Sequence, residues 1–220
     1  MNTVIIAVSQ GKGGAAKTTT SVNLAGALNE LGFKTFLFDW DVSKPDSVKW
    51  MEQGDFINWV KLIDKDDPVL DIETAKKNHD VLIYDTPPNY DPNAFKAIMA
   101  ADFVIIPTSM NYLDQENAKS AISVPILAKK PFKILMSKVK SGTKEGRAIQ
   151  SQVGNQDISF NAIITDRNVI AQCPRKGQWI GQYAKGSDSH EQFLKFAKEV
   201  ILWTGIKCHA RGTILKEVSL

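Results

Sequence analysis

Short apolar runs separated by longer mixed stretches organise the chain. The runs span residues 4–8, 33–38, 81–85, 103–108, 132–139 and 160–165. Most of them show no alternation of apolar and polar residues, which is typical of strands buried on both faces of a parallel sheet. A helix is predicted after the first run, because the apolar residues there share one helical face: Val22, Leu24, Ala25, Leu28 and Leu31. Residues 189–203 show the same helical spacing.

The alternation of strands and helices predicts an α/β fold. We expect a mostly parallel, twisted sheet with helices on both faces. Residues 45–79 follow the pattern less regularly. In that stretch we expect a short helix at 47–53, a strand at 56–63, a turn at 64–68 and part of a helix at 72–77.

A glycine-rich stretch lies between the first strand and the first helix. Residues 9–20 read SQGKGGAAKTTT. The backbone N–H groups of such a loop and the positive end of the following helix form an anion site. Lys17 adds a positive charge, and Thr18 adds a hydroxyl group that suits a magnesium ion. A glycine-rich turn with Lys-Thr at this spacing predicts a phosphate-binding loop.

A second lysine in the loop, Lys12, narrows the class of phosphate-binding protein that the sequence predicts. Residues 12–19, KGGAAKTT, resemble the deviant Walker A box, KGGxGKTT, of the ParA/MinD family of dimerising ATPases. The resemblance implies a P-loop NTPase fold, in particular that of short ParA partition proteins of the ParF type. It also implies a catalytic role for Lys12, which would reach across a nucleotide-sandwich dimer to the partner's phosphates.

The chain departs from the family pattern where Ala16 replaces a glycine. A methyl group there stands where the backbone approaches phosphate closely, so we expect weakened but not abolished nucleotide binding. The ligand implied by the resemblance is ATP with Mg²⁺. The loop residues that would bind the nucleotide are Gly11, Lys12, Gly13, Gly14, Ala15, Ala16, Lys17, Thr18 and Thr19.

Carboxylates follow two of the predicted strands. Asp39 and Asp41 come after the second run, and Asp85 ends the third. Open α/β sheets bind ligands at the carboxyl ends of their strands. Residues 39–41 resemble the family's Walker A′ segment, and residues 81–85 resemble Walker B. By resemblance, Asp41 sets the attacking water, Asp39 and Thr18 support the magnesium shell, and Asp85 reaches the metal through water.

Later segments add further points of resemblance. Thr86 would begin the switch that senses the γ-phosphate. Residues 112–115 are similar to a stretch that supports dimer contacts in the family, and residues 166–169 are similar to a segment of plasmid-partition ATPases. Residues 136–138, at the end of a predicted strand, are candidates for the adenine neighbourhood.

Length and composition suit one cytoplasmic domain. A chain of 220 residues with 43% apolar content can bury one sizeable core. We assign residues 1–203 to a ParA-type ATPase domain and residues 204–220 to a tail. We expect neither a membrane span nor a secretory signal, because no run of about 18 apolar residues occurs and the first residues lack a signal pattern. Cys173 and Cys208 lack metal-ligand spacing and are expected to be reduced thiols.

The net charge of +3 hides an asymmetry. Residues 1–128 carry a net charge of −6, whereas residues 129–220 carry +9. A basic half is either an ordinary solvated surface or the footprint of nucleic-acid binding. Arg167, Arg175 and Lys176 are our candidate DNA contacts.

These features predict an ATPase that acts as a dimerisation switch, with weak, partner-stimulated hydrolysis. It would form an ATP-dependent homodimer, bind nucleoid DNA non-specifically and segregate a plasmid or similar cargo through a ParB-like adaptor protein. A MinD-like membrane-associated ATPase and an interaction module with an impaired nucleotide site are the alternatives. An iron–sulfur reductase is disfavoured, because residues 80–120 contain no cysteine.

Overall fold

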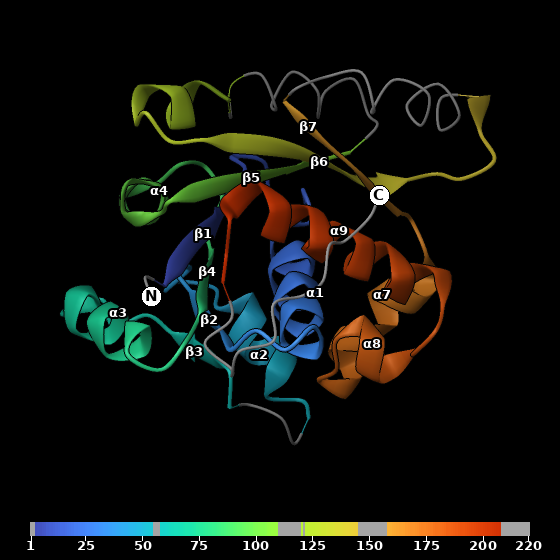
Figure 1. Cartoon of the computed structure of the whole chain (residues 1–220), viewed down its shortest axis with the longest axis horizontal. Coiled ribbons are helices and arrows are strands. Elements are labelled where there is room, and N and C mark those ends of the chain that lie inside the picture. The colour runs from blue at the N-terminus through green and yellow to red at the C-terminus, as the bar shows by residue number, and fades with distance from the viewer. Residues whose placement is uncertain (1–2, 55–57, 110–119, 121, 145–157, 208–220) are drawn as a thin grey trace.

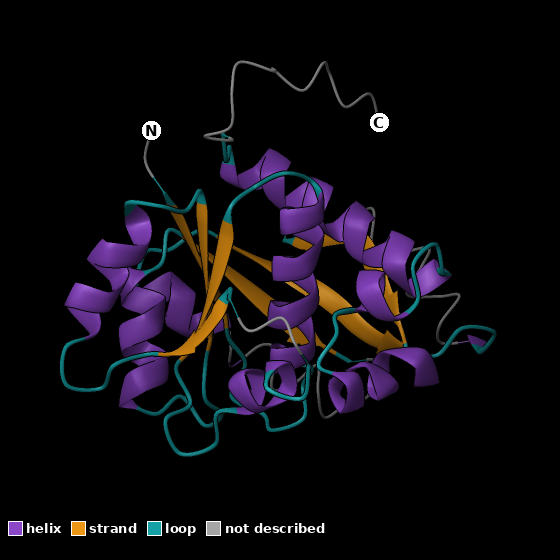
Figure 2. Ribbon diagram, turned by 90° about the horizontal axis from the view of Figure 1, so that it is seen from below, coloured by secondary structure: helices purple, strands orange, loops and turns teal. Residues whose placement is uncertain are grey.

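Seven parallel strands form one sheet at the centre of the molecule. The structure is a computed structural model that describes residues 3–54, 58–109, 120, 122–144 and 158–207. The strand order is β3-β2-β4-β1-β5-β6-β7, and every recorded strand pair is parallel. Helices lie on both sides of the strands (Figure 1, Figure 2). The predicted α/β sheet with helices on both faces is confirmed.

The bounds of the elements agree closely with the apolar runs. The strands are β1 (Val4–Val8), β2 (Thr35–Asp39), β3 (Val60–Leu62), β4 (Val81–Asp85), β5 (Phe103–Thr108), β6 (Phe132–Val139) and β7 (Ser159–Thr165). The helices are α1 (Lys17–Glu30), α2 (Asp46–Met51), α3 (Pro68–Lys76), α4 (Pro92–Ala100), α7 (Asn168–Gln172), α8 (Ile180–Tyr183) and α9 (Asp188–Thr204), with a 3-10 turn η2 (Cys173–Lys176).

Several predicted boundaries differ from the structure. The strand expected at 56–63 is β3 at Val60–Leu62, and the helix expected at 47–53 is α2 at Asp46–Met51. Two further differences have local reasons. The strand expected from Phe33 begins only at Thr35, because the Phe33 N–H donates to the Leu28 carbonyl and remains part of the turn that ends α1. Helix α3 begins at Pro68, which was expected in the turn at 64–68, and it includes Ile72 from the predicted part of a helix. The Asp67 carboxylate accepts the Leu70 N–H at 3.0 Å and so caps the helix one turn earlier. The segment at 112–115 and the tail from 208, including Cys208, lie outside the described residues.

The core consists of two apolar layers, one on each face of the sheet. Ile6 and Val8 of β1 pack in one layer with α1 and α9. Ile5 and Ala7 of the same strand pack in the other layer with α4. Successive side chains of a strand point to opposite faces, so an unbroken apolar run is required when both faces are covered.

Helix α1 is buried almost all round, not only on its predicted apolar face. Every residue from Thr20 to Leu28 is buried, because the helix lies between the sheet and the segment that leads to α9. A Cβ atom on Gly26 would lie 2.3 Å from the Trp179 ring, and the Asn23 side chain accepts the Ile180 N–H at 2.8 Å. This packing fixes α1 and with it the loop that precedes it.

Helix α9 covers the edge strand β7 and confirms its predicted apolar stripe. Phe193, Phe196 and Val200 are fully buried. Polar side chains of the same helix accept backbone N–H groups of β7: Glu199 accepts that of Asn161 at 2.7 Å, and Gln192 accepts that of Thr165 at 2.9 Å. The edge of the sheet is thus capped instead of left open for pairing with another chain.

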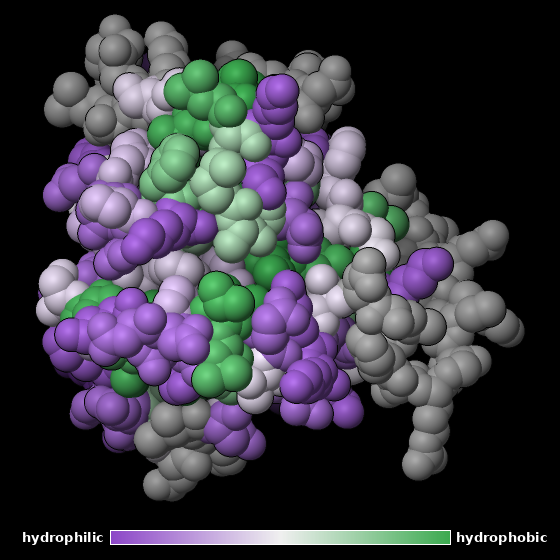
Figure 3. Space-filling model, turned by 90° about the vertical axis from the view of Figure 1, so that its left-hand side faces the viewer, coloured by the Kyte–Doolittle hydropathy of each residue, from purple (hydrophilic) through white to green (hydrophobic). Residues whose placement is uncertain are grey.

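The surface is polar with separate apolar groups. On the face seen from the left of Figure 1, apolar side chains gather in places with polar side chains between them (Figure 3). The large exposed apolar residues of α3 and α4 are Val69, Leu70, Phe95 and Met99. No helix among the described residues is long and apolar enough to cross a membrane.

Candidate functional site

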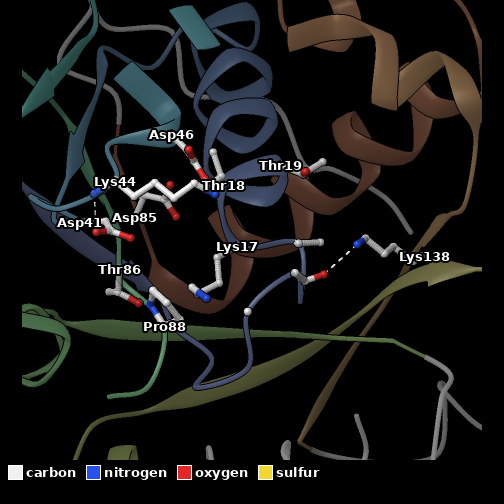
Figure 4. Close-up of a pocket in the computed structure, with 13 residues that line it drawn as sticks. Lys17, Thr18, Thr19, Asp41, Lys44, Asp46, Asp85, Thr86, Pro88 and Lys138 are labelled. Carbon is white, nitrogen blue, oxygen red and sulfur yellow. Dashed lines mark hydrogen bonds and ion pairs between the residues drawn. The ribbon is translucent and has the colours of Figure 1, made fainter. Parts of the chain in front are cut away.

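A pocket of about 300 Å³ opens where β1, β2 and β4 end (Figure 4). The loop after β1 forms one wall, and the residues after β2 and β4 form the other. The lining residues are Gly13, Gly14, Ala16, Lys17, Thr18, Thr19, Asp41, Lys44, Asp46, Asp85, Thr86, Pro88 and Lys138. The pocket therefore combines loop backbone, three lysines and several carboxylates.

The loop reaches the pocket through left-handed backbone conformations. Gly14 has a φ of 74° and Ala16 has a φ of 68°. Ala16 is also the N-cap of α1, and its side chain caps no backbone group. The first N–H groups of a helix have no partners within the helix, and they carry the positive end of its dipole. The start of α1 consequently presents donors for an anion.

Lys17 places a positive charge inside this loop. Its side chain is only 8% exposed, and its Nζ donates to the Lys12 main-chain carbonyl at 3.2 Å. Burial lowers the pKa of Lys17, while the nearby charges of Asp85 and Asp41 oppose that shift. A desolvated ammonium group next to loop amides interacts strongly with a phosphate.

Asp85 lies at the end of β4 in fully buried surroundings. It accepts a hydrogen bond from the Ser21 hydroxyl at 3.1 Å and another from the Thr18 side chain. Burial raises the pKa of Asp85 to about 8, and the neighbouring carboxylate of Asp39 adds to the shift. Asp39 is its register partner on β2.

Asp39 is directed away from the pocket and into the start of α2. One of its oxygens accepts the Ser47 hydroxyl at 2.6 Å and the Ser47 N–H at 2.9 Å, and the other accepts the Asp41 N–H at 3.0 Å. Although burial raises the pKa of Asp39, these donors favour its ionised form. We therefore assign the negative charge of the pair to Asp39 and the higher proton affinity to Asp85.

Asp41 lies at the mouth of the pocket on the segment after β2. Its carboxylate accepts the Ser43 hydroxyl at 2.7 Å and the Lys44 N–H at 2.9 Å. The Lys44 ammonium group is 3.1 Å from the Asp46 carboxylate, and both residues line the pocket. Asp41 is thus held near the loop by its own turn, not by the core.

The segment after β4 is tied to the beginning of the loop. The Thr86 hydroxyl donates to the Val8 carbonyl at 3.0 Å, and the Asn89 N–H donates to the Gly11 carbonyl at 2.7 Å. Asn89 and Tyr90 both have a positive φ, and the Tyr90 ring occupies the space that a Cβ on Gly11 would need. Movement in either segment must therefore affect the other.

A second cavity of about 200 Å³ adjoins the pocket and shares Ala16, Thr19 and Lys138 with it. Ser137, Ile164 and Phe193 are among its other lining residues. The buried Ser137 hydroxyl has no hydrogen-bond partner among the described residues. This cavity is less polar than the pocket, so it would suit a nucleoside next to a phosphate chain. Met136, the remaining residue of the predicted adenine neighbourhood, is buried and lines neither cavity.

The structure brings most, but not all, of the predicted site residues to the pocket. Gly11, Lys12, Ala15 and Asp39 are absent from its lining, although all four are described. The sequence pattern did not point to Lys44, Asp46 or Ser21 as site residues. Ser21 could still have been predicted from the sequence, because it lies one helical turn after Lys17 and therefore on the same side of α1, the side that faces β4.

The donor set fits a magnesium nucleotide instead of a metal held by protein alone. No cluster of three or more His, Cys, Asp or Glu suited to a metal occurs in the part of the chain that the structure describes. Mg²⁺ is usually held by one or two protein oxygens together with phosphates and water. Thr18 and Asp85 are the pocket residues that would supply those oxygens, and the metal would neutralise phosphate charge.

The comparisons with known proteins agree with this geometry. The model of the CobQ/CobB/MinD/ParA nucleotide-binding domain matches residues 6–180. Maintenance of carboxysome distribution protein A from Halothiobacillus neapolitanus is 32% identical over 207 residues, which cover 89% of this chain and 95% of that protein. Sporulation initiation inhibitor protein Soj from Bacillus subtilis is 24% identical over 246 residues, with coverage of 89% and 97%.

A solved structure supports the fold. The septum site-determining protein MinD of Pyrococcus horikoshii, in complex with Mg-ADP, superposes with a TM-score of 0.76 at 20% identity and covers 92% of this chain and 98% of its own. The chain belongs to the CobQ/CobB/MinD/ParA family of nucleotide-binding domains, within its ParA/MinD branch of P-loop ATPases. The family predicted from the loop is confirmed.

The raised pKa of Asp85 predicts a pH-dependent cost in stability. A carboxyl whose pKa is higher in the folded than in the unfolded state loses its stabilising contribution as the pH rises from about 4 to about 8. We expect Asp85→Asn to raise the free energy of unfolding at pH 8.5 by more than about 1 kcal/mol, the equivalent of roughly one pKa unit. The gain should shrink toward pH 5. Urea denaturation at both pH values measures it, with the exposed Asp66→Asn as control. A pH-independent difference would contradict the assignment.

The left-handed conformation of Ala16 predicts that glycine is preferred there. Left-handed backbone costs a non-glycine residue about 1–2 kcal/mol, whereas glycine loses about 0.5–1 kcal/mol more conformational entropy on folding. We expect Ala16→Gly to raise the free energy of unfolding by about 0.5–1 kcal/mol. Gly14→Ala, also at positive φ and with open space around it, should lower it. Gly13→Ala controls for the entropy effect alone, and a loss of stability in Ala16→Gly would refute the strain argument.

Proposed function

We propose that the protein is an ATP-dependent dimerising ATPase of partition or positioning type. It would hydrolyse ATP to ADP and phosphate in the described pocket, weakly on its own and faster with a partner protein. The observation that carries this proposal is the meeting of Lys17, Thr18 and Asp85 at one pocket beside the start of α1. This is the arrangement that phosphate transfer by positioning and electrostatics requires.

Each residue would have a distinct part in hydrolysis. Lys17 and the loop amides would hold the phosphates, and Thr18 with Asp85 would organise the magnesium ion. Asp41 would orient the attacking water, because it lies at the pocket mouth with a fixed turn around it. Asp39 would support the metal site indirectly, by its charge beside Asp85 and by its hold on α2. Lys12 would act from the partner subunit.

Lys12 supports the dimer part of the proposal. It does not line the pocket of its own subunit, and its recorded contact to Lys17 uses the main-chain carbonyl. Its side chain can therefore be changed without removing that bond. A lysine ammonium group that meets the phosphates of the partner's nucleotide would link dimerisation to the presence of the γ-phosphate.

We expect Lys12→Ala to weaken ATP-dependent dimerisation by roughly 10-fold or more. With a slowly hydrolysed ATP analogue and Mg²⁺, light scattering over a protein concentration series should give a higher dimer dissociation constant for the variant than for the wild type. A charge-assisted hydrogen bond contributes about 1.5–3 kcal/mol, which is enough to shift the equilibrium by 10-fold or more. The exposed Lys65→Ala is the control. Equal dimerisation of wild type and Lys12→Ala would remove the sandwich model.

The second candidate function is an interaction module with an impaired nucleotide site. Ala16 favours it, because its Cβ stands in a loop that must approach phosphate and its backbone is left-handed. Calorimetric titration with Mg·ATP separates the two candidates. Binding by the wild type below millimolar ATP, tightened in Ala16→Gly, supports the ATPase, and an absence of wild-type binding up to millimolar ATP supports the module.

We extend the proposal to non-specific DNA binding in the nucleoid, with a ParB-like adaptor and a plasmid or similar cargo. Arg175 and Lys176 support it as exposed residues of η2 in the basic part of the chain. Arg167 is exposed at the end of β7 but lines the second cavity, so it suits a nucleotide contact at least as well. Arg175 and Lys176 are accordingly the better candidates for DNA.

We expect the double variant Arg175→Ala/Lys176→Ala to weaken DNA binding at equal nucleotide-site occupancy. Affinity for duplex DNA should fall with salt at a log–log slope of roughly −0.9 per neutralised phosphate, and the variant should show a shallower slope. Filter binding over a salt series, with and without the ATP analogue, measures both values. Lys49→Ala/Lys65→Ala, two exposed lysines of the acidic part, is the matched control. DNA binding that is absent, or indifferent to nucleotide, would contradict this role.

A further inference from the structure

Lys138 connects the end of β6 to the phosphate-binding loop. Its Nζ donates to the Gly14 carbonyl at 2.7 Å, across 124 positions of the chain. In Figure 4 it extends toward the loop from the side opposite Asp41 and Asp85. This hydrogen bond joins β6 to the exposed part of the loop. Gly14 itself is exposed and left-handed.

The backbone of β6 is shaped to make this contact. Lys138 has a φ of 53°, a conformation that lysine rarely adopts. The pairing of β6 with β7 shifts register between Ile134 and Met136, and again between Met136 and Val139. Irregularities of this kind re-aim a side chain near a functional site. The strain at Lys138 therefore coincides with the point where its side chain leaves the sheet and reaches the loop.

The bond acts on the part of the loop that would face phosphate. Gly14 and Ala15 share a trans peptide, in which the C=O and N–H groups point in opposite directions. Because the ammonium group of Lys138 holds the Gly14 carbonyl on one side, the Ala15 N–H is directed to the other. The charge-assisted bond thereby restrains a loop whose next residue, Ala16, is strained.

We propose that Lys138 is a positioning residue of the nucleotide site, which clamps the phosphate-binding loop in its anion-binding conformation through the Gly14 carbonyl. The inference rests on the proposed function only where it concerns nucleotide affinity. Lys138 lines both the pocket and the second cavity, so the clamp stands at the junction of the phosphate and nucleoside positions. Loss of the clamp should loosen the loop amides, while the other residues that line the second cavity should keep their positions.

The first test needs no nucleotide. Hydrogen exchange of the amides of residues 13–18 is measured in the wild type, Lys138→Met and Lys138→Arg. We expect exchange to be several-fold faster in Lys138→Met and close to wild type in Lys138→Arg, because arginine keeps the donor. Lys185→Met, an exposed lysine that lines neither cavity, is the control. Unchanged exchange in Lys138→Met would overturn the clamp even if the protein binds no ATP.

The second test measures affinity by calorimetry with Mg·ATP, Mg·ADP and adenosine. We expect Lys138→Met to weaken both nucleotides by a similar factor of roughly 10 to 100, the range for loss of one charge-assisted hydrogen bond, and to leave adenosine unaffected. Partial rescue by Lys138→Arg supports the clamp. An equal loss for adenosine would overturn it in favour of direct nucleoside contact. Failure of the wild type to bind ATP would count against the proposed function, whereas the exchange result still decides the role of Lys138.

Discussion

Burial of charge at the carboxyl end of β4 is the constraint on which the site depends. Asp85 is placed there by a strand that is fully buried on both faces, and Asp39 stands beside it on β2. Two neighbouring carboxylates in a low-dielectric environment cannot both ionise cheaply. Three features reduce the cost of this charge. Asp39 accepts hydrogen bonds from four donors, Asp85 accepts hydrogen bonds from hydroxyl groups, and the positive charge of Lys17 lies across the pocket. A cationic ligand at this point would relieve the remaining repulsion, which is why the donor set suits a magnesium ion.

The rest of the fold holds the opposing wall of the pocket still. Helix α1 is enclosed by the sheet on one side and by Trp179 and α9 on the other, so its first turn has little freedom to move. The conformation of the loop before it is less favourable, because the loop contains two left-handed residues and one of them is alanine. Contacts from distant parts of the chain restrain it: Asn89 holds the Gly11 carbonyl, and Lys138 holds that of Gly14. The site thus combines a rigid helix with a strained loop that is tied from both sides.

The segment after β4 connects the loop after β1 to the start of α4. Thr86 is bonded to the Val8 carbonyl of β1, and Asn89 is bonded to the Gly11 carbonyl of the loop. Asp91 caps α4 immediately afterwards. A change in the loop would therefore be felt at the start of α4, on the opposite face of the sheet from α1. These bonds give a physical route by which the loop and the start of α4 would move together.

The sequence by itself determined the order of strands and helices, the family and the loop. Strands buried on both faces are mostly apolar, so their limits at 103–108 and 132–139 could be predicted to the residue. The loop could also be predicted, because the spacing of its glycine, lysine and threonine residues along the chain is enough to indicate phosphate binding. Boundaries that depend on a cap or a turn, such as the start of α3 at Pro68, were less predictable. Only the tertiary structure decided that Asp39 turns toward Ser47, that Ala16 is left-handed, and that Lys138 reaches Gly14. These features depend on which segments become neighbours when the parallel strands assemble. Lys138 and Gly14 are 124 positions apart, so no local sequence pattern predicts their contact.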